Sequence, residues 1–239
     1  RFAAKLDFSI DESCQDFIRD QGVILRDVPA ARLYEEVLKL FHSGHAIESF
    51  RGLRDYYLLE HLFPEAADAL NGNEIALKFL QLAMQSTDER IRQNKPVTPA
   101  FLFAALMWAP LQARTEKRLT RGEPHSLALQ KAASAMISDQ IRYVSIPKRF
   151  TMVMRDIWAL QARFSYRQGK RAASVFEHPK FRAGYDFLCL RSQAGEISDE
   201  DCRWWTEFQK NSPEVQNRKT ESHRRRPPRR RRRSKNIKD

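Results

Sequence analysis

The chain has 239 residues, of which 42% are hydrophobic, enough for a substantial core in one large domain or two modest ones. It contains only 8 glycines and neither the G-x-G-x-x-G nor the G-x-x-x-x-G-K-[ST] pattern, which excludes nucleotide-binding loops of these two types. The net charge of +12 is concentrated in the C-terminal half, and such asymmetry is typical of a protein with a nucleic-acid or acidic-membrane partner.

Residues 1–64 form the first predicted region, and their apolar spacing is helical. An amphipathic pattern starts at Arg1, a second helix covers residues 32–41, and a third run extends from Ile47 to Phe63. The chain starts inside a helical pattern without Met and without a capping residue, so we expect it to be a piece of a longer protein.

The second predicted region, residues 65–144, is a helical body. Its most apolar segment follows Thr98 and Pro99, a capping residue and a first-turn proline. Because the helix from Phe101 to Trp108 has no polar face, we expect it to lie at the centre of a helical bundle and not in a membrane.

Residues 145–210 form the third predicted region, in which helices are interrupted at 168–170 and at 177–179. Residues 211–239 are polar and arginine-rich, and we expect this tail to be disordered. The sequence therefore predicts an all-α fold with a disordered basic tail, which would bind polyanions with little selectivity.

The third region carries a dense set of cations. Residues 142–182 contain ten Lys or Arg and only two acids, Asp156 and Glu177. Arginine can bind phosphate bidentately and stack on bases. We therefore predict an RNA-binding surface made of Lys148, Arg149, Arg155, Arg163, Arg167, Lys170, Arg171, Lys180 and Arg182. We assign the interleaved aromatic residues mainly to packing.

The sequence shows no recognisable pattern of a catalytic or metal-binding site. The acidic pairs at 35–36, 88–89 and 199–201 are adjacent along the chain, so they splay apart on a helix and are interpreted as solvated charges. Cys14, Cys189 and Cys202 match no zinc or disulfide spacing, and we predict that they are buried, reduced thiols of a cytoplasmic protein.

Four motifs in order resemble the arginine-rich C-terminal domain of bacterial poly(A) polymerases, which are class II nucleotidyltransferases. The motifs are SIPKRF at 145–150 continuing to RDIW at 155–158, RQGKR at 167–171, EHPKFR at 177–182 and YDFL at 185–188. Upstream segments, at 1–6, 31–40, 62–64 and 99–105, are similar to the neck and body helices of the same enzymes.

The resemblance implies a neck, body and leg architecture and an enzyme that adds AMP from ATP to RNA 3′ ends, in mRNA processing and decay. It places the ATP-binding and Mg²⁺-binding head before Arg1, so no catalytic residue is assigned in this chain, and the segment alone is predicted to be inactive. Arg1, Arg32, Glu35 and Glu36 match the neck motif, whose implied role is to support the nucleotide-selecting helix by ion pairs.

Two alternatives remain at this stage. One is a tRNA CCA-adding relative, against which the arginine-rich region argues; the other is a stand-alone RNA-binding or adaptor protein, against which the start of the chain argues. The expected partners are RNA 3′ ends, without DNA specificity, and RNA-decay proteins that would contact the basic tail.

Overall fold

The computed structural model describes residues 2–211. Within them the chain is all-α, with fourteen α-helices, one 3₁₀ helix and no strand, which confirms the predicted fold class. None of the described helices has both the length and the apolar character needed to cross a membrane. The roles predicted for Arg1 and for the tail beyond Asn211 lie outside the described residues.

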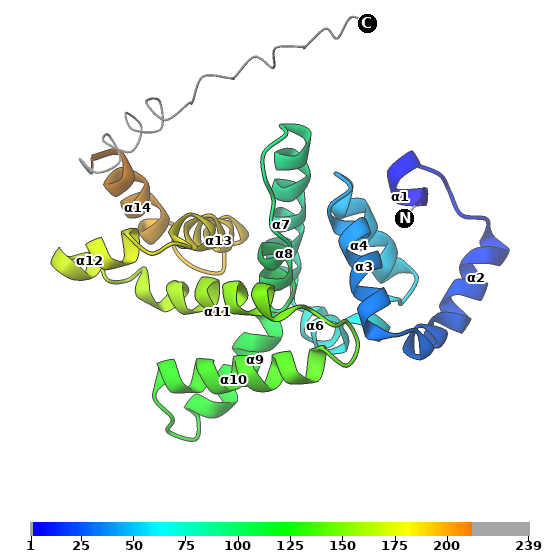
Figure 1. Ribbon diagram of the computed structural model, residues 1–239, viewed down its shortest axis with the longest axis horizontal. Coiled ribbons are helices and arrows are strands. Elements are labelled where there is room, and N and C mark those ends of the chain that lie inside the picture. Colours follow the sequence, from blue (N-terminus) through cyan, green and yellow to red (C-terminus); the bar gives the residue numbers. More distant parts are fainter. Residues whose placement is uncertain (1, 212–239) are drawn as a thin grey trace, which may run out of the picture. The chain divides into compact units, whose positions relative to one another are not determined.

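The helices follow one another closely along the chain (Figure 1). They are α1 (Phe2–Leu6), α2 (Glu12–Gln21), η1 (Gly22–Asp27), α3 (Ala30–Phe41), α4 (Ala46–Asp55), α5 (Leu59–Leu62), α6 (Pro64–Leu70), α7 (Glu74–Arg92), α8 (Pro99–Leu106), α9 (Trp108–Leu119), α10 (His125–Gln140), α11 (Lys148–Arg163), α12 (Gly169–Phe176), α13 (Phe181–Ala194) and α14 (Glu200–Asn211).

The described residues divide into two units, 2–202 and 203–211, and the first contains the main core. At its centre α8 packs against α7 and α11, as Figure 1 shows, and α13 packs against both α7 and α11. The indole N–H of Trp158 on α11 donates to the Ala104 carbonyl of α8 at 3.1 Å. This contact fixes α11 to the core, because a buried indole N–H must find an acceptor.

The apolar helix predicted after Thr98 is confirmed as a core element. Residues 102–106 of α8 are buried, and Pro99 occupies its first turn. The helix ends at Leu106 and α9 starts at Trp108, so the apolar run is divided between two helices at Met107. An all-apolar helix of this length is stable only when neighbouring helices cover every side of it.

The interpretation of Asp88 as a solvated charge is wrong. Its side chain on α7 is buried, and its two carboxylate oxygens accept hydrogen bonds from the amides of Ala46 at 2.7 Å and Ile47 at 3.1 Å. These amides are the first of α4 and have no partner within their own helix. Asp88 thus caps α4 across a long stretch of sequence, a role that local spacing cannot reveal.

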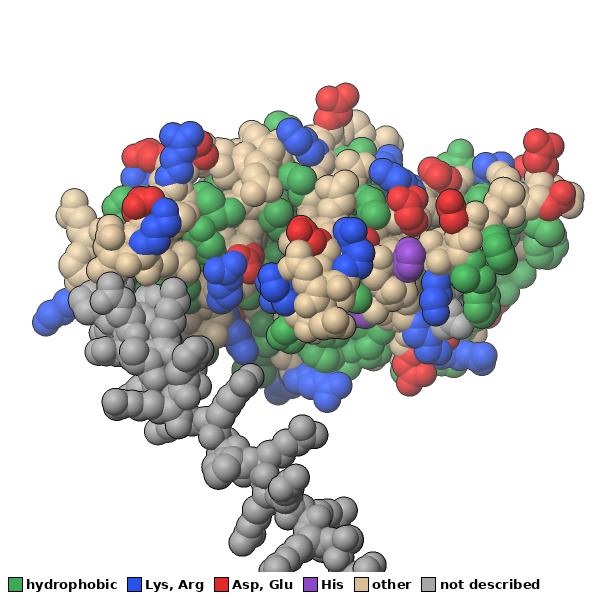
Figure 2. Space-filling view, turned by 90° about the horizontal axis from the view of Figure 1, so that it is seen from above, with side chains coloured by type: hydrophobic (Ala, Val, Ile, Leu, Met, Phe, Trp, Pro, Cys, Tyr) green, Lys and Arg blue, Asp and Glu red, His purple; other side chains and the backbone are tan. Residues whose placement is uncertain are grey.

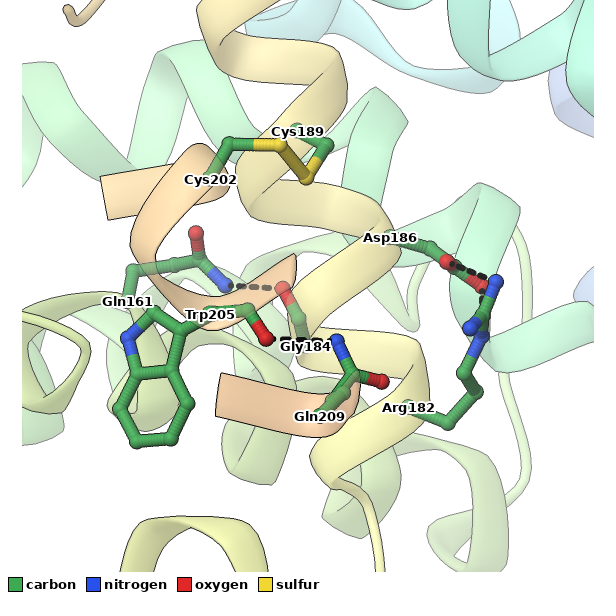
Figure 3. The surroundings of a disulfide bond; sticks show 8 residues. All are labelled: Gln161, Arg182, Gly184, Asp186, Cys189, Cys202, Trp205 and Gln209. Carbon is green, nitrogen blue, oxygen red and sulfur yellow. Dashed lines mark hydrogen bonds and ion pairs between the residues drawn. A yellow bond between two sulfur atoms is a disulfide. The ribbon is translucent and has the colours of Figure 1, made fainter. Parts of the chain in front are cut away.

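The cysteine prediction is also wrong. Cys189 on α13 and Cys202 on α14 form a disulfide, with their Cα atoms 5.2 Å apart (Figure 3). Cys14 is exposed. The turn between α13 and α14 brings the two cysteines together: Gly195 adopts φ 86° at the end of α13, a left-handed conformation that favours glycine. The spacing of 13 residues carries no such signal on its own.

Candidate nucleic-acid interface

The cations of α11 form a stripe along one side of the helix. Lys148, Arg155 and Arg163 are spaced by seven and eight residues, close to two turns in each case, so they lie on the same side of the helix. The opposite face, with Met154, Ile157, Trp158 and Leu160, is buried in the core. The hydroxyl of Ser134 on α10 accepts a hydrogen bond from Arg155 at 2.8 Å, which fixes the middle of the stripe.

Three consecutive helices begin with paired cations. These pairs are Lys148 and Arg149 in α11, Lys170 and Arg171 in α12, and Lys180 and Arg182 at the start of α13, and none of the three helices has an acidic residue in its first turn. The N-terminal end of a helix dipole is positive, so cations there weaken the helix. Their presence is costly for folding and suits an anionic ligand, which would meet the cations together with unpaired helix amides.

Carboxylates neutralise two of the nine predicted cations. Arg167 binds Asp201 and Glu200, each at 2.6 Å, and these contacts raise the pKa of Arg167 and lower that of Glu200. Arg182 binds Asp186 at 2.9 Å. The other seven have no carboxylate partner among the described residues. Asp201 and Glu200 are therefore not merely solvated charges, and Arg167 is less available to RNA than its sequence context indicates.

The interleaved aromatic residues mostly pack, as predicted. Trp158 and Phe181 are buried, whereas Phe150 and Phe176 are half-buried. Tyr166 is the exception: its side chain is 45% exposed, and the guanidinium of Arg171 lies 5.6 Å from its ring. An exposed ring beside an arginine is suited to stacking against a nucleobase.

The residues predicted to support the nucleotide-selecting helix lie on the exposed side of α3. Arg32, Glu35 and Glu36 are all exposed, while Leu33 and Val37 face the core. Glu36 binds Lys39 at 2.7 Å on the same helix. Because Arg1 lies outside the described residues, the role of the set in bracing the nucleotide-selecting helix stays a prediction.

Sequence reasoning missed Arg90. This arginine on α7 reaches to within 4.0 Å of Asp186 on α13, so it lies beside Arg182 in space although it is far from it in sequence. Arg90 lies in a segment that contains both acidic and basic residues, so the sequence gives no reason to assign it to a cationic surface. Only the packing of α7 against α13 assigns it to the basic region.

On the face shown in Figure 2, acidic side chains lie between the basic ones, so this face is not uniformly positive. Hydrophobic side chains gather at the right of this view, toward the end of the molecule where α1 and α2 lie. Phe2, Phe8 and Phe17 in these first segments are each more than half exposed.

Comparison with known proteins gives two family matches. Residues 7–70 match a family described as the probable RNA and SrmB-binding site of polymerase A, and residues 121–238 match one described as the polymerase A arginine-rich C-terminus. The second match includes all nine predicted RNA-binding residues, and the first includes Arg32, Glu35 and Glu36.

Individual relatives agree with these matches. The chain is 40% identical over 221 residues to poly(A) polymerase I of Salmonella typhi, 39% identical over 218 residues to that of Escherichia coli O157:H7 and 37% identical over 218 residues to that of Haemophilus influenzae. These alignments cover 89–90% of this chain and 47–48% of the relatives.

The chain thus spans about half the length of the curated relatives that it matches. The described parts of the two family matches include the helices that carry the predicted neck and RNA-binding residues. The chain therefore belongs to the bacterial poly(A) polymerase family, of which it carries the RNA-binding region and the arginine-rich C-terminus.

Proposed function

We propose that this chain is the RNA-binding part of a polynucleotide adenylyltransferase that adds AMP from ATP to RNA 3′ ends. The observation that carries the proposal is the set of paired cations at the starts of α11, α12 and α13, most of which have no carboxylate partner among the described residues. A polymerase without a template needs a grip that tolerates any sequence, and phosphate contacts supply one.

The chemistry of AMP transfer is proposed to reside outside this sequence. Adenylyl transfer depends on metal ions and on positioning of the triphosphate. Among the described residues there is no group of three or more His, Cys, Asp or Glu side chains that could hold a metal ion. We propose that ATP and Mg²⁺ bind to the catalytic head that the family resemblance implies. We expect the chain alone not to incorporate labelled ATP into RNA, and measurable AMP addition would contradict this assignment.

The match to an arginine-rich C-terminus favours this function over CCA addition. It also favours it over a stand-alone adaptor, because the relatives are all poly(A) polymerases. The division at residues 64, 144 and 210, a cytoplasmic location and protein partners of the basic tail remain predictions from the sequence.

RNA binding of the full chain tests the proposal when it is measured by filter binding over a range of salt concentrations. Each phosphate contact contributes about 0.7 to the slope of log affinity against log salt for a single strand. The double variant Lys148→Gln and Arg163→Gln removes two unneutralised cations of the α11 stripe. We expect the slope to become less steep by about 1.4 and the affinity at low salt to fall.

A matched control removes two exposed lysines from other helices. Lys78 on α7 and Lys117 on α9 carry the same charge and belong to none of the predicted sites. The double variant Lys78→Gln and Lys117→Gln lowers the net charge equally, so its slope should stay close to that of the parent. Equal slopes for the two double variants would show that only net charge matters and would contradict the proposed surface.

A further inference from the structure

A cavity of about 230 Å³ lies between α7, the segment that joins α7 to α8, and the start of α13. A buried water needs about 10–15 Å³ on this measure, so the cavity has room for a group the size of a nucleobase. Among the residues that line it are Arg90, Phe101, Lys180, Arg182 and Asp186. Only Lys180 and Arg182 were predicted from the sequence to bind RNA.

The polar side of the cavity is positively charged and held in place. Asp186 accepts a hydrogen bond from Arg182 Nε at 3.1 Å, as Figure 3 shows, and lies 4.0 Å from Arg90. Arg90 also donates to the Pro96 carbonyl at 3.1 Å. Together with Lys180, three cations thus face a single carboxylate, and the wall keeps an excess of positive charge. Positioned guanidinium groups with uncompensated charge bind phosphate well.

The remaining wall is apolar. It includes the half-buried ring of Phe101 together with Pro96, Val97 and Pro179. Phe101 is anchored by an edge contact with the core residue Phe187, with 6.0 Å between the ring centroids. A site that combines a fixed aromatic ring with a cationic rim suits a ligand with one flat apolar part and one anionic part.

We propose that this cavity binds one nucleotide of single-stranded RNA, with its base beside Phe101 and its phosphate against Arg90, Lys180 and Arg182. The inference rests on the proposed RNA-binding function and adds a specific subsite to it, in which α7 of the body contributes a contact that lies outside the arginine-rich segment. RNA that crosses the α11 to α13 region would be held here by a base as well as by its backbone.

The test compares Arg90→Gln with Arg92→Gln in the full chain, using a fluorescent oligoadenylate. Residues two apart on α7 point to nearly opposite sides, and Arg92 does not line the cavity, so the control has the same charge change on the same helix. Loss of a charged hydrogen bond to phosphate should weaken binding about tenfold in Arg90→Gln and flatten the salt slope by about 0.7. Arg92→Gln should bind like the parent.

A second comparison tests the base. The parent should bind oligoadenylate at least about fivefold more tightly than an abasic strand of the same length, because stacking on an aromatic ring is lost in the abasic strand. In Phe101→Leu, which keeps an apolar wall, this ratio should shrink, while Arg90→Gln should weaken binding of both strands. Thermal unfolding of each variant checks that the fold persists.

The outcomes separate this inference from the proposed function. Equal binding by Arg90→Gln and Arg92→Gln, while Lys148→Gln with Arg163→Gln weakens binding, would overturn the cavity and leave the RNA-binding surface in place. A fall in affinity for oligoadenylate in Arg90→Gln without loss on the abasic strand would overturn the assignment of phosphate to Arg90. No binding of RNA by the parent chain would overturn the proposed function itself.

Discussion

Gly184 shows how a single residue sets the approach of α13 to α11. A Cβ atom at this position would lie 2.8 Å from Leu160 Cδ1 and 3.2 Å from Leu160 Cβ. The amide group of Gln161 spans the same contact and donates to the Gly184 carbonyl at 3.1 Å (Figure 3). The two helices that carry most of the predicted RNA-binding residues are thus packed together without space for a methyl group.

Gly184→Ala should therefore destabilise the protein. Overpacking of a core typically costs about 1–3 kcal/mol, and urea unfolding should show a loss in this range. Gly52→Ala on α4 is the control, because the nearest atom to its added Cβ, on Tyr56, would be 3.9 Å away. Alanine is the better helix former, so that variant should gain up to about 1 kcal/mol. Equal effects of the two substitutions would contradict the close approach at Gly184.

His42, at the end of α3, should make stability depend on pH. Burial lowers the pKa of His42 below its ordinary value near 6.5, against a smaller opposite effect of the Leu38 carbonyl. The unfolded chain therefore binds more protons than the folded chain as the pH falls below about 6.5, and stability is lost in that range. Above it the contribution is fully present.

His42→Gln should remove this part of the pH dependence. The free energy of unfolding of the parent, measured by urea titration between pH 7.5 and pH 5, should fall more steeply than that of the variant, since glutamine does not titrate. Other histidines contribute equally to both proteins and cancel in the difference. Parallel curves would show that His42 is not protected from protonation in the folded state.

Among the elements, the start of α14 lowers the positive charge that the basic region can offer to RNA. Glu200 and Asp201 bind Arg167, and the adjacent Cys202 is tied to α13 by the disulfide. The bond holds the two carboxylates close to an arginine that would otherwise add to the cationic set. The available charge of this region therefore depends on a contact made by residues outside it.

Glu200→Gln together with Asp201→Asn should strengthen RNA binding. The substitutions remove both carboxylates from Arg167, and its charge becomes available to a phosphate, so the salt slope should steepen by about 0.7. The double variant Glu74→Gln and Glu116→Gln, on α7 and α9 and outside both matched regions, raises the net charge equally and serves as the control. A gain of the same size in the control would contradict the role of Arg167.

The sequence was sufficient to predict the elements whose signals are local. The apolar helix after Thr98 and the break at 177–179 appear in the structure, because their signals lie within a few residues. The break predicted at 168–170 is displaced: α11 ends at Arg163, and Gly169 and Lys170 already belong to α12. The cap supplied by Asp88, the disulfide and the proximity of Arg90 to Asp186 were not predicted. Each depends on two segments brought together by packing, which no local pattern encodes.

At the scale of the whole molecule, two sources of positive charge could bind RNA. One is the folded set on α11 to α13, and the other is the tail, where residues 211–239 contain twelve Lys or Arg and three acids. A run of basic residues binds polyanions with little selectivity, whereas cations fixed on helices have defined positions. The central claim is that the folded set binds RNA independently of the tail.

Filter binding of oligoadenylate across a range of salt concentrations, by the full chain and by a chain ending at Asn211, tests this claim most directly. Removal of the tail should flatten the salt slope, but the shortened chain should still bind, and Lys148→Gln with Arg163→Gln should flatten its slope by a further 1.4 or so. Loss of all binding when the tail is removed, or a shortened chain indifferent to these two substitutions, would contradict the account.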